Sequence, residues 1–317
     1  MVFNFYLDPE VIGVAAASPP YGMQALCDVL RGFLDNGLLF DFEDERCRQA
    51  IGRAVNSLPN GFDRKRAAAL FSALVKRNRI LCIMEPDWLS TTSDIDQALD
   101  LAPKYSIQLV LTEQTPTTTI PAGVECVTLA EYPTSVSGTE RHAAATTGRT
   151  YSGGEMSDAA FLDSNFANAF RHARRIEICD RLVGEKFADN FEHTVRQFFR
   201  FLEARLHDPG ACEVAIHCGA SNRNHHFCHM LASFRGQRTA SLRITTNFYS
   251  NPTEKPPLPH ERYIWTDQFA FLVGRGMDFL ERASGTNRDV SIDLKDESEV
   301  AQNVAAYDAM RVGSNAV

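Results

Sequence analysis

The sequence predicts an α/β protein made of two domains. Short apolar runs alternate with amphipathic segments in both halves of the chain, which is typical of a mostly parallel sheet covered by helices on both faces. The chain has 317 residues, whereas a single domain usually has roughly 100–200. Residues 132–157 are rich in Ser, Thr and Gly and lack periodic apolar residues, so we expect a linker there. The expected domains are residues 1–131 and 158–317.

The first domain is expected to be a three-layer α/β domain. Its strands are predicted from apolar runs, at Phe3–Leu7, Arg79–Met84, Ile107–Leu111 and Val124–Leu129. Its helices are predicted from apolar residues at helical spacing, at Tyr21–Asn36, Arg64–Arg77 and Asp94–Tyr105.

The second domain shows the same alternation and is expected to be an α/β sandwich. Its strands are predicted at Arg175–Cys179, Cys212–Cys218, Leu242–Phe248 and Val290–Leu294, with a close pair at Tyr263–Trp265 and Phe269–Val273. Its helices are predicted at Phe187–Leu206, His226–Phe234 and Ser298–Met310.

Composition narrows the class of protein. A formal net charge of −8 does not favour non-specific nucleic-acid binding, although it leaves room for a local basic site. The eight cysteines are scattered without a CxxC pair, which predicts buried free thiols in a reducing compartment. No apolar run reaches the roughly 20 residues that span a membrane, and the first residues lack a basic stretch and predict a strand. We therefore expect a cytoplasmic protein.

The most informative pattern lies in the second domain. His260, Arg262 and Asp267 have the spacing His-x-Arg-x4-Asp, and six residues separate Asp267 from Gly274. Residues i and i+2 of a strand share a face, so His260 and Arg262 should meet the same ligand. This pattern resembles the signature of phospholipase-D-type enzymes, His-x-Lys-x4-Asp followed after six residues by Gly-Ser-x-Asn.

The resemblance implies a catalytic site that needs no metal. His260 would be the nucleophile and form a phosphohistidine, and Arg262 would neutralise phosphate charge in the transition state. Arg binds phosphate through a planar fork, so the change from Lys keeps the charge and alters the geometry. Arg275, between Gly274 and Gly276, offers a second phosphate contact, although Arg275-Gly276-Met277 departs from Ser-x-Asn.

One family shares this variant. The chain resembles the phospholipase-D-like C-terminal domain of the MIT-domain-containing proteins, which also has prokaryotic relatives. Three pieces carry the resemblance over roughly 150 residues: Ile176–Asp180, then Asn190-Phe191 with Phe198–Glu203, and finally His260–Ile264 with Gly274–Phe279. The eukaryotic members look like lipid-binding modules without catalysis, and the MIT helices have no counterpart in residues 1–131. Asp267 matches the catalytic pattern instead.

Two functions stay open at this site. Catalysis of this type needs two histidines, one to attack and one to protonate the leaving oxygen. The motif occurs once, so we expect a homodimer that brings two copies of His260 together. In the alternative, the arginines bind a phosphate or an anionic lipid without turnover, and His260 and Asp267 are a fold signature.

A second cluster contains His217, Cys218, His225, His226, Cys228 and His229. His225 and His229 have the i, i+4 spacing of metal ligands on a helix. No partner pair is evident elsewhere, so we favour buried cysteines and histidines near the mouth of a site over zinc.

The first domain resembles a PIN-like nuclease fold. Asp8 closes the first strand, and Asp96 opens a helix sixteen residues before Thr112. The acid expected two residues after Thr112 is replaced by Gln114, with Glu113 beside it. Such enzymes gather carboxylates around Mg²⁺ or Mn²⁺, and Glu43 is a further candidate. Asp8 before Pro9 is equally typical of a turn or helix cap.

Together these patterns predict a phosphodiester-cleaving enzyme, in particular a nuclease. Nucleic acid is the expected substrate, and anionic lipid the ligand in the alternative function. A role as a prokaryotic defence effector against viruses rests on the analogy of architecture alone.

Overall fold

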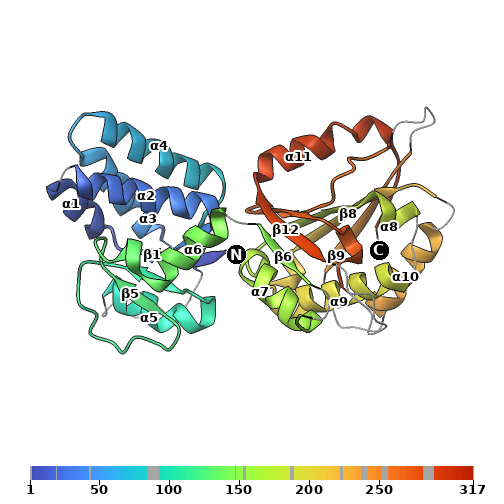
Figure 1. Cartoon of the computed structure of the whole chain (residues 1–317), viewed down its shortest axis with the longest axis horizontal. Coiled ribbons are helices and arrows are strands. Elements are labelled where there is room, and N and C mark those ends of the chain that lie inside the picture. The colour runs from blue at the N-terminus through green and yellow to red at the C-terminus, as the bar shows by residue number, and fades with distance from the viewer. Residues whose placement is uncertain are drawn as a thin grey trace. The chain divides into compact units, whose positions relative to one another are not determined.

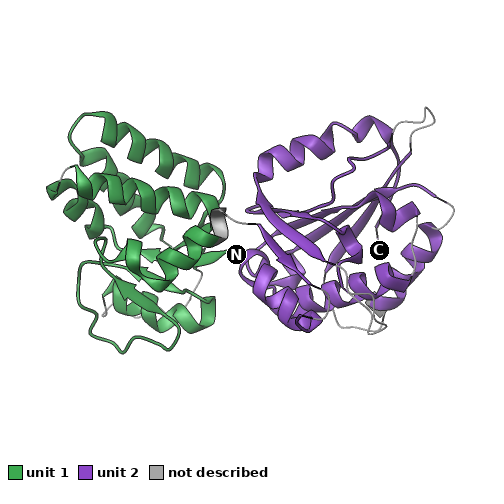
Figure 2. Ribbon diagram, in the orientation of Figure 1, with its two compact units in different colours: residues 1–146 green, residues 147–317 purple. Residues whose placement is uncertain are grey.

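The computed structural model describes residues 2–18, 20–42, 44–83, 93–146, 148–152, 155–185, 189–221, 224–236, 242–250, 256–280 and 289–316. The chain divides into two compact units, residues 1–146 and 147–317 (Figure 2). Each unit has its own sheet, so each is described by itself.

Unit 1 is built on a parallel sheet. Its strands are β1 (Phe3–Leu7), β2 (Gly37–Phe42), β3 (Ile80–Ile83), β4 (Leu109–Leu111) and β5 (Glu125–Val127). They lie in the order β3-β2-β1-β4-β5, and all neighbours are parallel. The order reverses between β1 and β4, and ligands of open α/β sheets usually bind at the carboxyl ends of the strands beside such a point.

The helices of unit 1 are α1 (Glu10–Ala17), α2 (Tyr21–Asn36), α3 (Arg46–Ser57), α4 (Phe62–Lys76), α5 (Asp94–Tyr105) and α6 (Val136–Thr146), with a short 3-10 turn at Tyr132–Thr134. Helices α1–α4 bury apolar side chains against one face of the sheet, including Leu26, Leu30 and Phe33 of α2. On the other face, Phe40 of β2 packs against Tyr105 of α5. The three layers that the sequence predicts are visible in Figure 1.

Unit 2 is built on a mixed sheet. Its strands are β6 (Arg149–Tyr151), β7 (Arg175–Cys179), β8 (Glu213–Gly219), β9 (Arg243–Tyr249), β10 (Tyr263–Thr266), β11 (Ala270–Val273), β12 (Val290–Lys295) and β13 (Arg311–Ala316). Their order is β13-β9-β8-β7-β10-β11-β12-β6. Only β7, β8 and β9 run parallel to one another; the other pairings are antiparallel.

Helices cover both faces of this sheet as well. They are α7 (Asp158–Phe170), α8 (Arg181–Glu185), α9 (Asp189–Arg205), α10 (Asn224–Gly236) and α11 (Glu297–Ala305), with 3-10 turns at Pro209–Ala211, Gly276–Asp278 and Asp308–Met310. On one face, Phe166 and Phe170 of α7 pack on Phe271 of β11, and Phe198 of α9 packs on Phe166. On the other, Val300 and Val304 of α11 pack with Cys179, Tyr263 and Trp265. The sheet is therefore a middle layer between helices.

Residues 132–157 are not the linker that composition predicted. Helix α6 packs in unit 1, where Asn36 Nδ2 donates to Arg141 O at 3.2 Å. Strand β6 pairs with β12 of the second sheet. The Ser, Thr and Gly content of this segment therefore does not mark a structureless stretch. Within the described residues, no helix has the length and apolar character needed to cross a membrane.

Candidate functional site

The phospholipase-D-like motif folds into a hairpin whose open end is a polar corner. Strand β10 leaves from His260-Glu261-Arg262 and returns through β11 to Gly274, because Tyr263 pairs with Leu272. Arg262 Nη1 donates to Gly274 O at 2.9 Å, and Val273 N donates to Arg262 O. Arg262 and Gly274 therefore meet at one end of the hairpin, and His260 lies two residues before Arg262, outside the strand.

This corner lies at the carboxyl end of β7. Strand β10 runs antiparallel to β7, so the residues before Tyr263 lie beside Asp180, which follows Cys179. His260 is exposed there, and the Arg262 side chain is 22% exposed. This is the edge where the parallel strands β7–β9 end, the usual location of ligands in open α/β sheets.

The two arginines of the corner each face a carboxylate. Arg262 Nε lies 3.7 Å from Asp180 Oδ1. Arg275 Nη2 lies 2.9 Å from Asp278 Oδ2, and its Nε donates to Asp278 O. Two positive charges are therefore matched by two negative ones, and the strong local positive charge implied by the motif is largely offset.

Asp180 is the centre of this corner. Its carboxylate accepts the N–H of Met277 at 2.7 Å and the N–H of Leu182 at 2.9 Å, and the residue is 1% exposed. Burial raises the pKa of Asp180 to about 6, against the opposing influence of the Met277 N–H, Arg262 and the Leu182 N–H. Gly276 has a φ of +63°, and a Cβ there would overlap Asp180 and Arg262.

Asp267 does not belong to this corner. It follows the far end of β10, where its carboxylate accepts Arg174 N at 3.2 Å. It lies five positions after Arg262, which is roughly 16 Å along a strand. The structure therefore does not bring Asp267 beside Arg262, because the strand carries the two ends of the motif apart.

The opposite face of the same sheet holds a polar chain that sequence reasoning missed. His217 Nε2 lies 2.8 Å from Glu177 Oε2, and its Nδ1 lies 2.8 Å from the Tyr249 hydroxyl. Tyr249 in turn donates to Asp308 at 3.4 Å. Burial opposes the charge of Glu177, but His217 and Arg175 lower its pKa. Only the pairing of β7, β8 and β9 brings these residues together, so local spacing gives no signal.

The other members of the His/Cys cluster do not join His217. Cys218 is buried in β8 with its thiol 3.7 Å from Asn247 O, and Cys228 of α10 lies 3.8 Å from Thr246 Oγ1. His225, His226 and His229 are exposed on α10. Across the described part of the chain, no three His, Cys, Asp or Glu side chains are arranged to hold a metal.

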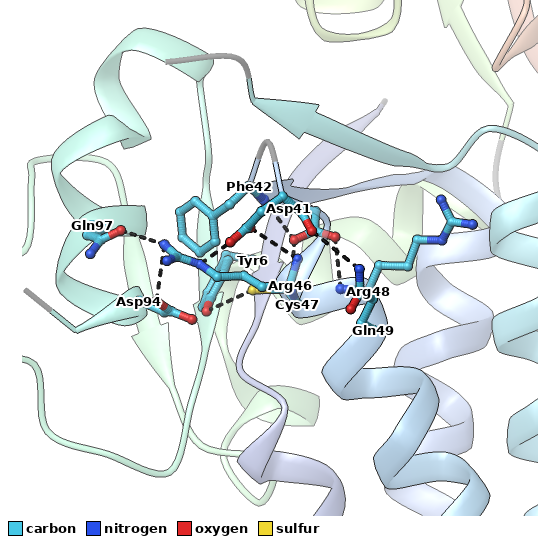
Figure 3. Close-up of polar contacts among 10 residues, drawn as sticks. Tyr6, Asp41, Phe42, Arg46, Cys47, Arg48, Gln49, Asp94 and Gln97 are labelled. Carbon is cyan, nitrogen blue, oxygen red and sulfur yellow. Dashed lines mark hydrogen bonds and ion pairs between the residues drawn. The ribbon is translucent and has the colours of Figure 1, made fainter. Parts of the chain in front are cut away.

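In unit 1, the acidic side chains of Asp41 and Asp94 lie near the carboxyl end of β2 (Figure 3). Asp94, at the start of α5, lies 3.2 Å from Arg46 Nη2, which also donates to Gln97. Burial raises the pKa of Asp94, Arg46 opposes this, and the nearby Asp44, Asp8 and Asp41 add to the rise. Asp41 accepts the N–H groups of Phe42, Cys47 and Arg48.

The acids predicted in unit 1 have internal partners. Asp8 accepts Thr112 Oγ1 at 2.8 Å and Glu10 N at 3.1 Å, so it serves the start of α1 as a cap would. Asp96 accepts the N–H groups of Thr117 and Thr118. Glu113 accepts Leu129 N at 2.9 Å. Glu43 lies outside the described residues.

Among the described residues, these carboxylates are not grouped as a metal site would be. Mg²⁺ and Mn²⁺ need several oxygens that converge on one point. Here the carboxylates of Asp41 and Asp96 accept backbone N–H groups, and Asp94 forms an ion pair with Arg46. The described residues of unit 1 therefore give no support to metal catalysis.

No protein-family model matches the chain, and no curated protein matches it significantly.

Proposed function

We propose that the protein binds a phosphodiester at the corner formed by His260, Arg262 and Gly274, and cleaves it with His260 as nucleophile. The observation that carries this proposal is the 2.9 Å hydrogen bond from Arg262 to Gly274 O, which joins the two halves of the motif beside an exposed histidine. The fold resemblance that we propose for unit 2 is the phospholipase-D-like one, and for unit 1 the PIN-like one.

In this mechanism the His260 ring attacks phosphorus, and one ester oxygen leaves as the phosphohistidine forms. Arg262 is held by Gly274 and Asp180 and stabilises the charge on the phosphoryl oxygens. A second histidine protonates the leaving oxygen, and water then releases the phosphate from His260.

The second histidine has to come from another copy of the chain. His217 is directed at Glu177 and Tyr249 on the opposite face of the sheet, so it does not serve. We propose a homodimer in which two copies of His260 share one phosphate. Sedimentation of the full chain should give twice the mass of 35.3 kDa. A monomer at working concentration would contradict this route.

The ion pairs of the corner favour a second candidate function. Arg262 and Arg275 are both offset by carboxylates, which suits weak anion binding better than strong charge stabilisation. In this alternative the corner binds a phosphate of nucleic acid or an anionic lipid without turnover.

One experiment separates the two functions. DNA, RNA and a chromogenic phosphodiester are incubated with the protein in EDTA, beside His260→Ala and the matched control His229→Ala, another exposed histidine. We expect cleavage by the wild type and by His229→Ala, and none by His260→Ala. Cleavage that disappears in EDTA would indicate a metal-dependent reaction and not attack by His260. Tight phosphate or vesicle binding with no cleavage of any substrate would favour the second candidate, binding without turnover.

A further inference from the structure

Asp180 has an unusual combination of burial and charge. It is 1% exposed, yet its two oxygens serve the N–H groups of Leu182 and Met277, and Arg262 Nε lies 3.7 Å away. It therefore fixes both sides of the corner, since Arg262 precedes β10 and Met277 follows β11.

The surroundings of Asp180 let it take up a proton. Burial raises its pKa to about 6, and the negative charge of Asp278 adds to the rise. Asp278 is offset by Arg275, Arg181 by Glu185, and burial keeps the thiols of Cys179 and Cys218 neutral. In the part of the chain that the structure describes, Arg262 is the cation paired with Asp180.

We infer that Asp180 is a proton-operated positioning residue, whose charged form offsets Arg262 and whose neutral form leaves the full charge of Arg262 to a bound phosphate. This inference rests on the proposed function. It adds that phosphate affinity at the corner rises as the solution becomes mildly acidic. Asp180 does not touch the ligand; it acts through Arg262.

Coulomb's law sets the size of the effect. A guanidinium about 4 Å from a bound anion raises its affinity by about a thousandfold at an effective dielectric constant near 20, so releasing even part of the Arg262 charge from Asp180 changes the affinity by at least tenfold. In the proposed function, the His260 imidazole contacts the same phosphate. The test therefore has to remove His260 first.

The probe is dimethyl phosphate, which keeps one negative charge from pH 5 to pH 8. Its binding to the full chain is measured by calorimetry at both pH values. His260→Ala should bind at least tenfold more tightly at pH 5 than at pH 8. His260→Ala combined with Asp180→Asn should show little pH dependence, and His260→Ala combined with Arg262→Gln should lose the gain in acid.

The outcomes separate this inference from the proposed function. Equal affinity of His260→Ala at the two pH values, or an unchanged pH dependence in both double variants, would overturn the role of Asp180 alone. Failure of the wild type to bind at either pH would contradict the phosphate site itself. If Asp180→Asn does not fold, the Arg262→Gln pair still decides the matter.

Discussion

Gly276 shows how closely the corner of unit 2 is packed around Asp180. Its φ is +63°, a left-handed conformation that costs other residues energy, and a Cβ would overlap the Asp180 carboxylate and the Arg262 stem. We expect Gly276→Ala to lower the free energy of unfolding of unit 2 by about 2–4 kcal/mol, from strain and overpacking together. Urea denaturation followed by circular dichroism measures it.

Gly13→Ala is the matched control, because a Cβ at Gly13 meets nothing within 4 Å and the residue lies inside helix α1. It should leave stability unchanged or raise it slightly. Equal effects of the two substitutions would contradict the packing around Gly276.

The hydrogen bonds that link Glu177, His217, Tyr249 and Asp308 give a second prediction at this scale. Tyr249→Phe removes the hydroxyl that His217 contacts at 2.8 Å, and leaves a ring nitrogen without that partner. We expect a loss of about 1–3 kcal/mol in the free energy of unfolding. Thermal melts measure this loss. The control Tyr21→Phe, at a residue that is 85% exposed, should have no effect in them. A Tyr249→Phe variant as stable as the wild type would show that these hydrogen bonds do not stabilise the fold.

The sequence predicted side chains well where they are close along the chain. Arg262 and Gly274 meet because a tight hairpin follows from two short apolar runs. The sequence did not predict contacts between side chains that only the pairing of distant strands brings together. The contact of Arg262 with Asp180 spans the pairing of β10 with β7, and no local spacing encodes it.

At the scale of elements, α5 is anchored through its first turn. Ser93 caps the helix, and Asp96 accepts the N–H groups of Thr117 and Thr118 and the hydroxyl of Thr117. The Thr117 hydroxyl, the Thr118 N–H and Ser93 lower the pKa of Asp96 to about 2. The carboxylate therefore ties the helix to the segment that follows β4.

This tie predicts a pH dependence. A carboxylate with a depressed pKa stabilises the fold above its unfolded pKa, near 3.9, and loses that contribution as the pH falls through about 2. Asp96→Asn should therefore be less stable than the wild type at pH 6, with a smaller difference at pH 2. Urea denaturation across this range is the measurement. A difference that stays constant with pH would contradict the charged tie.

Elements were hardest to predict where the usual boundary signals are missing. Helix α2 ends at Asn36 and β2 begins at Gly37 with no loop between them, so Gly37–Phe42 was not predicted as a strand. Helix α6 and strand β6 lie in a segment whose composition is typical of loops, and tertiary packing overrides that preference. The long amphipathic helices and the apolar strands were predicted close to their observed bounds.

At the scale of the molecule, both units are layered α/β folds, as alternating elements predicted, with a parallel sheet in unit 1 and a mixed sheet in unit 2. The antiparallel half of the second sheet was not expected. It arises because the connection between β10 and β11 is too short for a crossover helix, so the two strands must run in opposite directions.

The boundary between the units can be tested with fragments. Residues 147–317 keep β6 beside β12, whereas residues 158–317, the domain expected from composition, lack that edge strand. We expect the longer fragment to fold cooperatively and to melt several degrees above the shorter one, because losing β6 exposes the edge of β12 and removes Tyr151 from its contact with Phe161. Equal melting temperatures would place the boundary at residue 158.

The central claim is that His260 attacks the phosphorus of a diester, and a covalent phosphoryl adduct tests it most directly. A rapid mix of full-length protein and substrate in EDTA is quenched in alkali, where phosphohistidine persists, and the peptides are analysed by mass spectrometry. We expect an adduct on the peptide that contains His260, present in His229→Ala and missing from His260→Ala. Turnover in EDTA without an adduct, or with an adduct on another residue, would contradict it.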